Sequence, residues 1–153
     1  MPTKIMFVCH GNICRSPMAE YVFRDLAQKA GRGKEFLVAS TAVSTEEIWG
    51  DVGNPVYPPV KKLLSGLGIS CEEKRARQLT IKDGEEYDYI LCMDTSNVRR
   101  AKQIVGDRYA TKVVRLLDFV GAGGDVADPW YTRNFDETYR DILFASSRLL
   151  EML

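Results

Sequence analysis

One short stretch near the N-terminus constrains the fold of this chain more than any other. Residues 4–16 read Lys-Ile-Met-Phe-Val-Cys-His-Gly-Asn-Ile-Cys-Arg-Ser, and Pro17 follows them. The apolar run from Ile5 to Val8 is typical of a buried parallel strand. Pro17 suits the first turn of a helix, and Ser16 is a residue type that caps helix N-termini. The stretch therefore predicts a strand, a tight loop and a helix that has Ser16 as its N-cap.

The predicted loop has the features of an anion site. Backbone N–H groups at a helix start point toward the ligand, and the helix dipole adds positive potential. A curled loop can direct several such groups at one tetrahedral anion, and both Gly11 and Asn12 tolerate the left-handed backbone that a curl requires. The residues expected to bind the phosphate are His10, Gly11, Asn12, Ile13, Cys14 and Arg15.

Cys9 and Arg15 give this loop a predicted chemistry. An arginine fork can hold two oxygens of a phosphate, and a thiol beside an arginine and a helix N-terminus loses its proton readily. Cys9 at the floor of the loop would then be a nucleophile, and the Ser16 hydroxyl could donate a hydrogen bond to its sulfur. The alternative is a buried cysteine in a strand and an unrelated surface arginine, since Cys-x5-Arg alone is a weak pattern.

Length and charge place further limits on the function. A chain of 153 residues is the size of one domain, which we expect to span residues 1–153. Lys plus Arg and Asp plus Glu number 21 each, so bulk charge does not favour nucleic acid or a membrane surface as a partner. The sequence has no apolar run of spanning length and no signal-peptide pattern, which predicts a cytoplasmic protein.

The four cysteines, at positions 9, 14, 71 and 92, do not have the spacing of metal ligands. We therefore expect no metal and no cofactor. Two interpretations of Cys14 stay open. It is either a small apolar residue packed under the loop, or the partner of Cys9 in a reversible disulfide that would make the site redox-sensitive.

Strand and helix patterns alternate along the chain, which predicts an α/β fold. Strands separated by helices pair in parallel through right-handed crossovers, and a ligand then binds at the carboxyl ends of the strands. The expected architecture is a three-layer, doubly wound sheet of four parallel strands with helices on both faces. The predicted strands are residues 5–8, 35–40, 87–93 and 111–117, and the predicted helices are residues 17–30, 58–67, 94–105 and 135–152.

The string Val-Cys-His-Gly-Asn-Ile-Cys-Arg-Ser-Pro-Met-Ala-Glu, which begins at Val8, resembles the low-molecular-weight protein tyrosine phosphatase family. The resemblance implies hydrolysis of phosphotyrosine and aryl phosphate monoesters through a phosphocysteine intermediate. The partner would be a phosphotyrosine protein or a small aryl phosphate, and inorganic phosphate would be the product. The resemblance also favours the disulfide interpretation of Cys14.

The resemblance assigns further roles. Its Asp-Pro-aromatic motif matches residues 128–130 and implies that Asp128 is the general acid, although Asp-Pro alone is only a turn signal. Asp118 and Asp125 are the alternatives. The family's loop-fixing asparagine corresponds to Asn12, and Ser40 corresponds to its partner.

Aromatic residues are expected at the mouth of the site. The resemblance places Trp49, Trp130 and Tyr131 around the entrance, where they would favour a flat aryl phosphate. The chain departs from the family pattern between residues 40 and 60, where acidic residues are added. It also has Lys74 where members often carry histidine.

Two other functions are compatible with this fold. An arsenate reductase needs two further cysteines close together after the third strand, and only Cys92 lies there. A silent phosphate-binding module would not require Cys9, Arg15 and Asp128 together. The sequence therefore favours a phosphatase over both alternatives.

Overall fold

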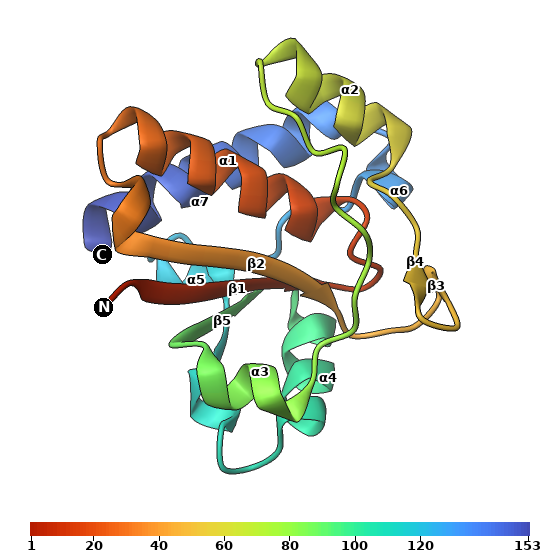
Figure 1. Ribbon diagram of the computed structural model, residues 1–153, viewed down its shortest axis with the longest axis vertical. Helices are drawn as coiled ribbons and strands as arrows, with labels where there is room; N and C mark the ends of the chain where they lie inside the picture. The colour runs from red at the N-terminus through yellow and green to blue at the C-terminus, as the bar shows by residue number, and fades with distance from the viewer.

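The computed structural model describes residues 1–153 and confirms the predicted α/β architecture (Figure 1). A four-stranded parallel sheet forms its centre, and a two-stranded hairpin lies apart from that sheet. The strands are β1 (Thr3–Cys9), β2 (Phe36–Ala42), β3 (Ile48–Trp49), β4 (Val52–Gly53), β5 (Tyr89–Cys92) and β6 (Val113–Arg115). The α-helices are α1 (Arg15–Lys29), α2 (Pro58–Gly66), α3 (Ile81–Glu86), α4 (Thr95–Val105), α5 (Leu116–Phe119), α6 (Pro129–Thr132) and α7 (Phe135–Met152). Short 3₁₀ turns cover Gly33–Glu35 and Ala110–Lys112.

The order of the strands places the loop after β1 in the middle of the sheet, at the carboxyl ends of the strands. The order is β2-β1-β5-β6, and every pair is parallel. Helices α1 and α7 cover one face of the sheet, and α3 and α4 cover the other (Figure 1). The chain leaves β1 toward β2 and later returns on the other side of β1 as β5. Ligands of doubly wound sheets bind in the crevice at such a point, and here that crevice lies beside Cys9.

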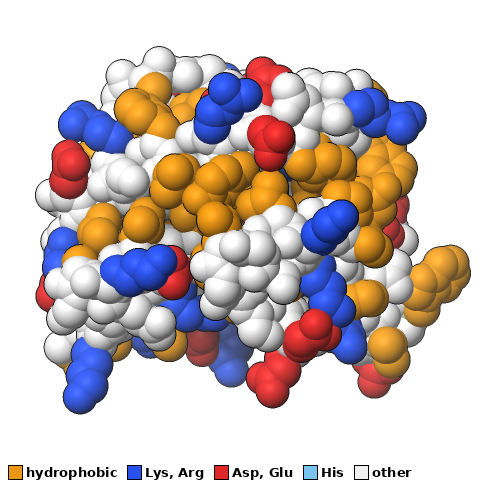
Figure 2. All heavy atoms as spheres, turned by 90° about the horizontal axis from the view of Figure 1, so that it is seen from above, with side chains coloured by type: hydrophobic (Ala, Val, Ile, Leu, Met, Phe, Trp, Pro, Cys, Tyr) orange, Lys and Arg blue, Asp and Glu red, His pale blue; other side chains and the backbone are white.

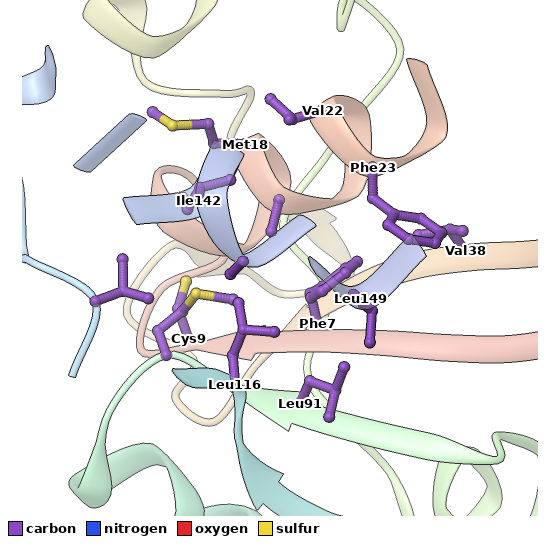
Figure 3. Close-up of a cluster of buried hydrophobic side chains, with 14 of the residues drawn as sticks. Phe7, Cys9, Met18, Val22, Phe23, Val38, Leu91, Leu116, Ile142 and Leu149 are labelled. Carbon is purple, nitrogen blue, oxygen red and sulfur yellow. The ribbon is translucent and has the colours of Figure 1, made fainter. Parts of the chain in front are cut away.

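Strand β1 is apolar throughout because both of its faces are covered. Phe7 and Cys9 join the core under α1 and α7, whereas Met6 and Val8 point to the core beside α4. Figure 3 shows Cys9 at the margin of the larger core, near Met18 and Leu116. Burying each large side chain of this kind contributes about 1.5–3 kcal/mol. Two buried cores therefore anchor the strand that carries Cys9.

Several boundaries differ from the predictions. The strand predicted over residues 111–117 is shorter, because Leu116 and Leu117 begin α5. A short apolar run does not distinguish a strand from a buried helical turn, which explains the error. Strand β2 extends to Ala42, two residues beyond the predicted end, because Ala42 pairs with Cys9 and bridges to Gln78.

Helix α3, the hairpin of β3 and β4, and the short helix α6 were not predicted. Helix α3 begins with a capping box, in which the Thr80 side chain accepts a hydrogen bond from the Asp83 N–H and the Asp83 carboxylate accepts one from the Thr80 N–H. Within the segment 41–54, β3 and β4 pair as a short antiparallel hairpin. Gly53 in β4 packs so closely on Ala76 that an added Cβ would lie 1.9 Å from the Ala76 carbonyl oxygen. The hairpin is therefore fixed by a contact that is distant in the sequence.

The face that carries α1, α2 and α7 exposes hydrophobic side chains. Figure 2 looks onto this side, where hydrophobic side chains gather in a band. Leu67, Ile69 and Tyr139 line a cavity of ≈ 110 Å³ in this region, and a second cavity of ≈ 230 Å³ lies between α1 and residues 68–70. Neither cavity is lined by a residue of the loop 9–16. None of the helices combines the length and the apolar composition that crossing a bilayer requires.

Candidate active site

The loop between β1 and α1 curls around the Cys9 sulfur. Asn12 is the residue of this loop with left-handed backbone, at φ 59°, whereas Gly11 is not left-handed. The Asn12 N–H points inward and lies 3.3 Å from the Cys9 Sγ. The N–H groups of Gly11, Ile13 and Cys14 donate to no other protein atom. The curl therefore offers several free donors around the sulfur, as an anion-binding nest does.

The start of α1 differs from the prediction for Ser16. The helix begins at Arg15, and its N-cap is Cys14, which makes no side-chain capping bond. Ser16 lies inside the first turn, and its hydroxyl is 3.0 Å from the Cys9 Sγ. The predicted capping role is thus wrong, because the hydroxyl faces the sulfur instead of the helix end.

Arg15 lies at the mouth of the loop and is almost completely buried. Its Nη1 donates to the Val126 carbonyl at 3.1 Å, and its Nη2 lies 3.0 Å from Asp94 Oδ2 and 3.4 Å from Asp128 Oδ2. Burial lowers the pKa of Arg15, but Cys9, Asp128 and Asp94 raise it by more, so the net shift is upward. The guanidinium is therefore a fixed positive charge that contacts two carboxylates and interacts electrostatically with the Cys9 sulfur.

The side of the loop turned toward the protein interior is held by neutral hydrogen bonds. Asn12 Nδ2 donates to Ser16 Oγ at 2.8 Å and to Ser40 Oγ at 2.9 Å. The Arg77 N–H donates to Asn12 Oδ1 at 3.1 Å, which fixes the orientation of the amide. Because Ser16 accepts a hydrogen bond from Asn12, its own proton can go either to Cys9 Sγ at 3.0 Å or to the Thr41 carbonyl at 3.4 Å, and the sulfur is the nearer of the two. The structure thus brings Asn12, Ser16 and Ser40 together under Cys9.

Asp128 is presented by the start of α6. Its Oδ1 accepts a hydrogen bond from the Trp130 N–H at 3.0 Å, while its other oxygen faces Arg15. Pro129 occupies the first turn of this short helix, where its missing N–H costs nothing. The side chain of Asp128 is 31% exposed, so it borders the cleft.

The two alternative acids lie elsewhere. Asp118 and Asp125 both pair with Arg115, at 2.9 and 2.8 Å, on the outside of the loop 118–128. Burial raises the pKa of Asp125, but hydrogen bonds from Arg115 and Thr95 outweigh it and lower the pKa overall. Neither acid contacts Arg15, so Asp128 is the one of the three that shares the site with Cys9.

The predicted aromatic residues lie at the surface around this edge. Trp49 is 73% exposed on β3, and Trp130 and Tyr131 are exposed on α6. The ring of Tyr57 lies 5.6 Å from that of Trp130, and the Tyr57 N–H donates to the Ile13 carbonyl in the loop. Sequence reasoning missed Tyr57 and Asp94. An aromatic residue before Pro58 and an acid after β5 were the available signals for them.

The remaining residues of the loop and the other cysteines have less direct roles. His10 turns away from the sulfur, and its Nε2 lies 2.9 Å from Glu46 Oε2. All four cysteines are free. Burial, and then the charges of Cys9 and Asp128, raise the pKa of the Cys14 thiol, and burial also raises the pKa of Cys92. Cys92 is fully buried in β5, which argues against a role for it as a redox relay.

Comparison with known proteins places this chain in a family. A family model described as low molecular weight phosphotyrosine protein phosphatase matches residues 4–153. The chain belongs to this family. Over 148 residues it is 38% identical to the low molecular weight protein-tyrosine-phosphatase YfkJ of Bacillus subtilis, covering 95% of this chain and 92% of the relative. Over 154 residues it is 34% identical to the low molecular weight phosphotyrosine protein phosphatase of Schizosaccharomyces pombe, covering 98% and 96%.

Solved structures agree with this assignment. The crystal structure of YfkJ superimposes with a TM-score of 0.90 at 36% identity, covering 99% of this chain and 94% of that one. Vibrio vulnificus Wzb in complex with benzylphosphonate superimposes with a TM-score of 0.84 at 26% identity, covering 100% of both chains. The family and these relatives make the chain a protein tyrosine phosphatase, and therefore a hydrolase.

Proposed function

We propose that this protein hydrolyses phosphotyrosine and aryl phosphate monoesters through a phosphocysteine intermediate, with Cys9 as the nucleophile. The observation that carries the proposal is the position of the Cys9 sulfur, which accepts the Asn12 N–H at 3.3 Å in a loop whose neighbouring N–H groups are free, and which interacts with the buried charge of Arg15. Arg15 and the loop amides, from His10 to Arg15, would hold the three non-bridging oxygens of the phosphate. Such positioning and charge stabilisation supply most of the catalysis in phosphoryl transfer.

The first step transfers the phosphoryl group to the enzyme. The Cys9 thiolate attacks phosphorus, the S–P bond forms, and the bond from phosphorus to the tyrosine oxygen breaks. Asp128 gives its proton to that oxygen as it leaves, which matters most for leaving groups of high pKa. Proximity supports this role, since Asp128 Oδ2 lies 3.4 Å from Arg15 Nη2, and the charges of both Asp128 and Cys9 act on Arg15.

The second step returns the enzyme to its starting state. Water attacks the phosphocysteine, the Asp128 carboxylate takes a proton from that water, and the S–P bond breaks to release inorganic phosphate. The departing sulfur is again a thiolate, which the Ser16 hydroxyl at 3.0 Å can stabilise with a hydrogen bond. Every group that these two steps use comes from the protein, so the proposal requires no metal or cofactor.

The substrate class follows from the rim of the site. Trp49, Trp130 and Tyr131 border the entrance with exposed aromatic surface, and Tyr57 supports Trp130 from behind. A flat aryl phosphate can stack on such walls, whereas a short phosphoserine side chain would not reach the sulfur between them. Wzb binds benzylphosphonate, an aryl compound, which supports the same class for this chain. We propose a single phosphatase domain over residues 1–153 that acts in the cytoplasm.

The nucleophile is tested by Cys9→Ser, with Cys71→Ser as a matched control. Cys71 is also buried and reduced but lies outside the site. We expect Cys9→Ser to lose at least about 10,000-fold of p-nitrophenyl phosphate hydrolysis, and Cys71→Ser to stay within about threefold of the parent. Acid quenching during turnover should trap one phosphoryl group on Cys9, detected by mass spectrometry. Substantial activity in Cys9→Ser would overturn the mechanism.

The general acid is tested by Asp128→Asn beside Asp118→Asn and Asp125→Asn. Loss of a general acid costs about 100-fold or more when the leaving group is poor. We expect that loss for Asp128→Asn on phenyl phosphate, with a smaller loss on p-nitrophenyl phosphate, whose leaving group needs no proton. The other two variants should stay within about threefold of the parent on both substrates. A leaving-group-dependent loss of activity in either of them would contradict the assignment of Asp128 as the general acid.

A further inference from the structure

A buried carboxylate lies behind the loop, on the side opposite the cleft. Glu20 on α1 is only 5% exposed. Its Oε1 accepts the Ser40 hydroxyl proton at 2.6 Å, and its Oε2 pairs with Arg24 at 2.6 Å. An ionised carboxylate only accepts hydrogen bonds, so it commits the Ser40 proton to Glu20. Ser40 must then accept from Asn12, whose amide also donates to Ser16, so the Ser16 proton is left to Cys9 Sγ or to the more distant Thr41 carbonyl.

A buried cation accompanies this carboxylate. The side chain of Lys74 is 12% exposed, and its Nζ donates to the Ser40 carbonyl at 2.9 Å and lies 3.8 Å from Glu20 Oε1. Burial lowers the pKa of Lys74, and the charges of Glu20 and Cys9, which favour its protonated form, offset this only in part, so the net shift is downward. Ser40, which the ammonium holds, accepts a hydrogen bond from Asn12, and the Asn12 N–H donates to the Cys9 sulfur. The ammonium is thus linked to the interior side of the loop by this hydrogen-bonded chain, and its charge also acts on Cys9.

We propose that Lys74 is a positioning residue, whose positive charge stabilises the Cys9 thiolate from the interior side of the loop and is opposed by the charge of Glu20. The inference rests on the proposed function, because it concerns the thiolate of that mechanism. Lys74 does not touch the substrate. It acts through the field at the sulfur and through Ser40, whose carbonyl it holds and whose hydroxyl supports Asn12.

The other charged residues near Lys74 and Glu20 lie on neighbouring elements, and the variants used in the test leave them unchanged. Arg24 on α1 and Arg77 beside β2 face Lys74, and both disfavour its charged form. The charge of Cys9 acts on Cys14, Arg15, Lys74 and Cys92, and Asp94 and Asp128 also contact Arg15. Because Lys74 and Glu20 have opposite charges within one cluster, removing each should move the thiolate equilibrium in opposite directions.

The experiment measures the pH dependence of Cys9 alkylation by iodoacetamide in the full chain, with mass spectrometry to identify the modified residue. We expect Lys74→Met to raise the pH midpoint of alkylation by about 0.5–1 unit, which slows alkylation about 3- to 10-fold below the midpoint. We expect Glu20→Gln to lower the midpoint. Lys74→Arg, which keeps the charge, should stay within about 0.3 unit of the parent. The exposed Lys62→Met is the matched control and should not move it.

Thermal unfolding of each variant separates this role from a structural one. Midpoints that move in opposite directions for Lys74→Met and Glu20→Gln support the proposal, whatever their melting temperatures. Midpoints that move together, or that stay fixed while only stability falls, overturn it. If Lys74→Met does not fold, then Lys74→Arg decides, because a midpoint moved by more than about 0.5 unit in a folded, equally charged variant contradicts the proposal.

The alkylation assay can also fail independently of the proposed phosphatase mechanism. Alkylation reports the thiolate without turnover, so the midpoints can fail to move while Cys9→Ser is still inactive. In that case the mechanism stands and Lys74 has no electrostatic role. Activity that survives in Cys9→Ser would instead remove the mechanism, whatever the midpoints show.

Discussion

The two sides of the loop 9–16 are built from different interactions. Toward the interior, Asn12, Ser16 and Ser40 are at most 1% exposed and join through hydrogen bonds of 2.8–2.9 Å. Toward the cleft, Arg15 meets Asp94 and Asp128, whose side chains are 22% and 31% exposed. The interior side contacts the loop through neutral donors and acceptors, with the buried charges of Glu20 and Lys74 behind Ser40, whereas the cleft side is a set of charges beside solvent.

This difference teaches how the loop can be both rigid and reactive. A buried donor that loses its partner costs about 1–3 kcal/mol, so the interior side has strong reason to keep one arrangement. Charges near solvent are screened, and the carboxylates can share Arg15 with an incoming phosphate at lower cost. The interior side therefore fixes the shape of the loop, and the cleft side carries the chemistry.

Among variants that test this difference between the two sides, Arg15→Lys is expected to have the largest effect on activity. Lysine keeps the charge but loses the planar fork that holds two oxygens, so we expect kcat/KM for p-nitrophenyl phosphate to fall about 100- to 1000-fold. Arg99→Lys is the matched control, since Arg99 is exposed on α4, and should change kcat/KM by less than about twofold. A small effect of Arg15→Lys would mean that charge alone, without geometry, is sufficient on the cleft side.

A smaller effect on rate but a larger effect on stability is expected for Asn12→Gly. Glycine accepts the left-handed backbone of this position but removes the side-chain hydrogen bonds. We expect the free energy of unfolding to fall by about 2–3 kcal/mol and the activity to fall about 10-fold, measured by denaturant titration and steady-state kinetics. Asn12→Ala should lose about 1 kcal/mol more, because alanine disfavours that backbone. If alanine is the more stable variant, the curl of the loop is not held as described.

The smallest expected effect is that of Trp49→Ala at the rim. The side chain is mostly exposed, so its removal should leave the melting temperature unchanged. Loss of one stacking wall should raise KM for an aryl phosphate about 2- to 10-fold, with kcat little affected. Leu67→Ala, an exposed apolar residue near the end of α2, serves as the control and should leave KM unchanged. An unchanged KM for Trp49→Ala would show that the hairpin does not contribute to substrate binding.

The parts of the site that could be predicted from the residues themselves lie close together in the sequence, whereas the distant Asp128 and Ser40 were assigned only through the family resemblance. Cys9, Asn12 and Arg15 fall within seven residues, between an apolar strand and a helix start, so local rules were sufficient to place them around one anion. The same locality explains the error at Ser16. A serine before a proline satisfies the rule for an N-cap, but the contact with the Cys9 sulfur makes a different use of its hydroxyl.

The sequence by itself determined the alternation of strands and helices, the strand–loop–helix unit at residues 3–29 and the chemistry of its loop. These depend on periodicity and on neighbouring residues, which a linear pattern records. Only the tertiary structure decided which distant groups meet that loop, including Asp94, Lys74 and Tyr57. Such contacts depend on sheet order and on the packing of separate elements, and no local pattern contains that information.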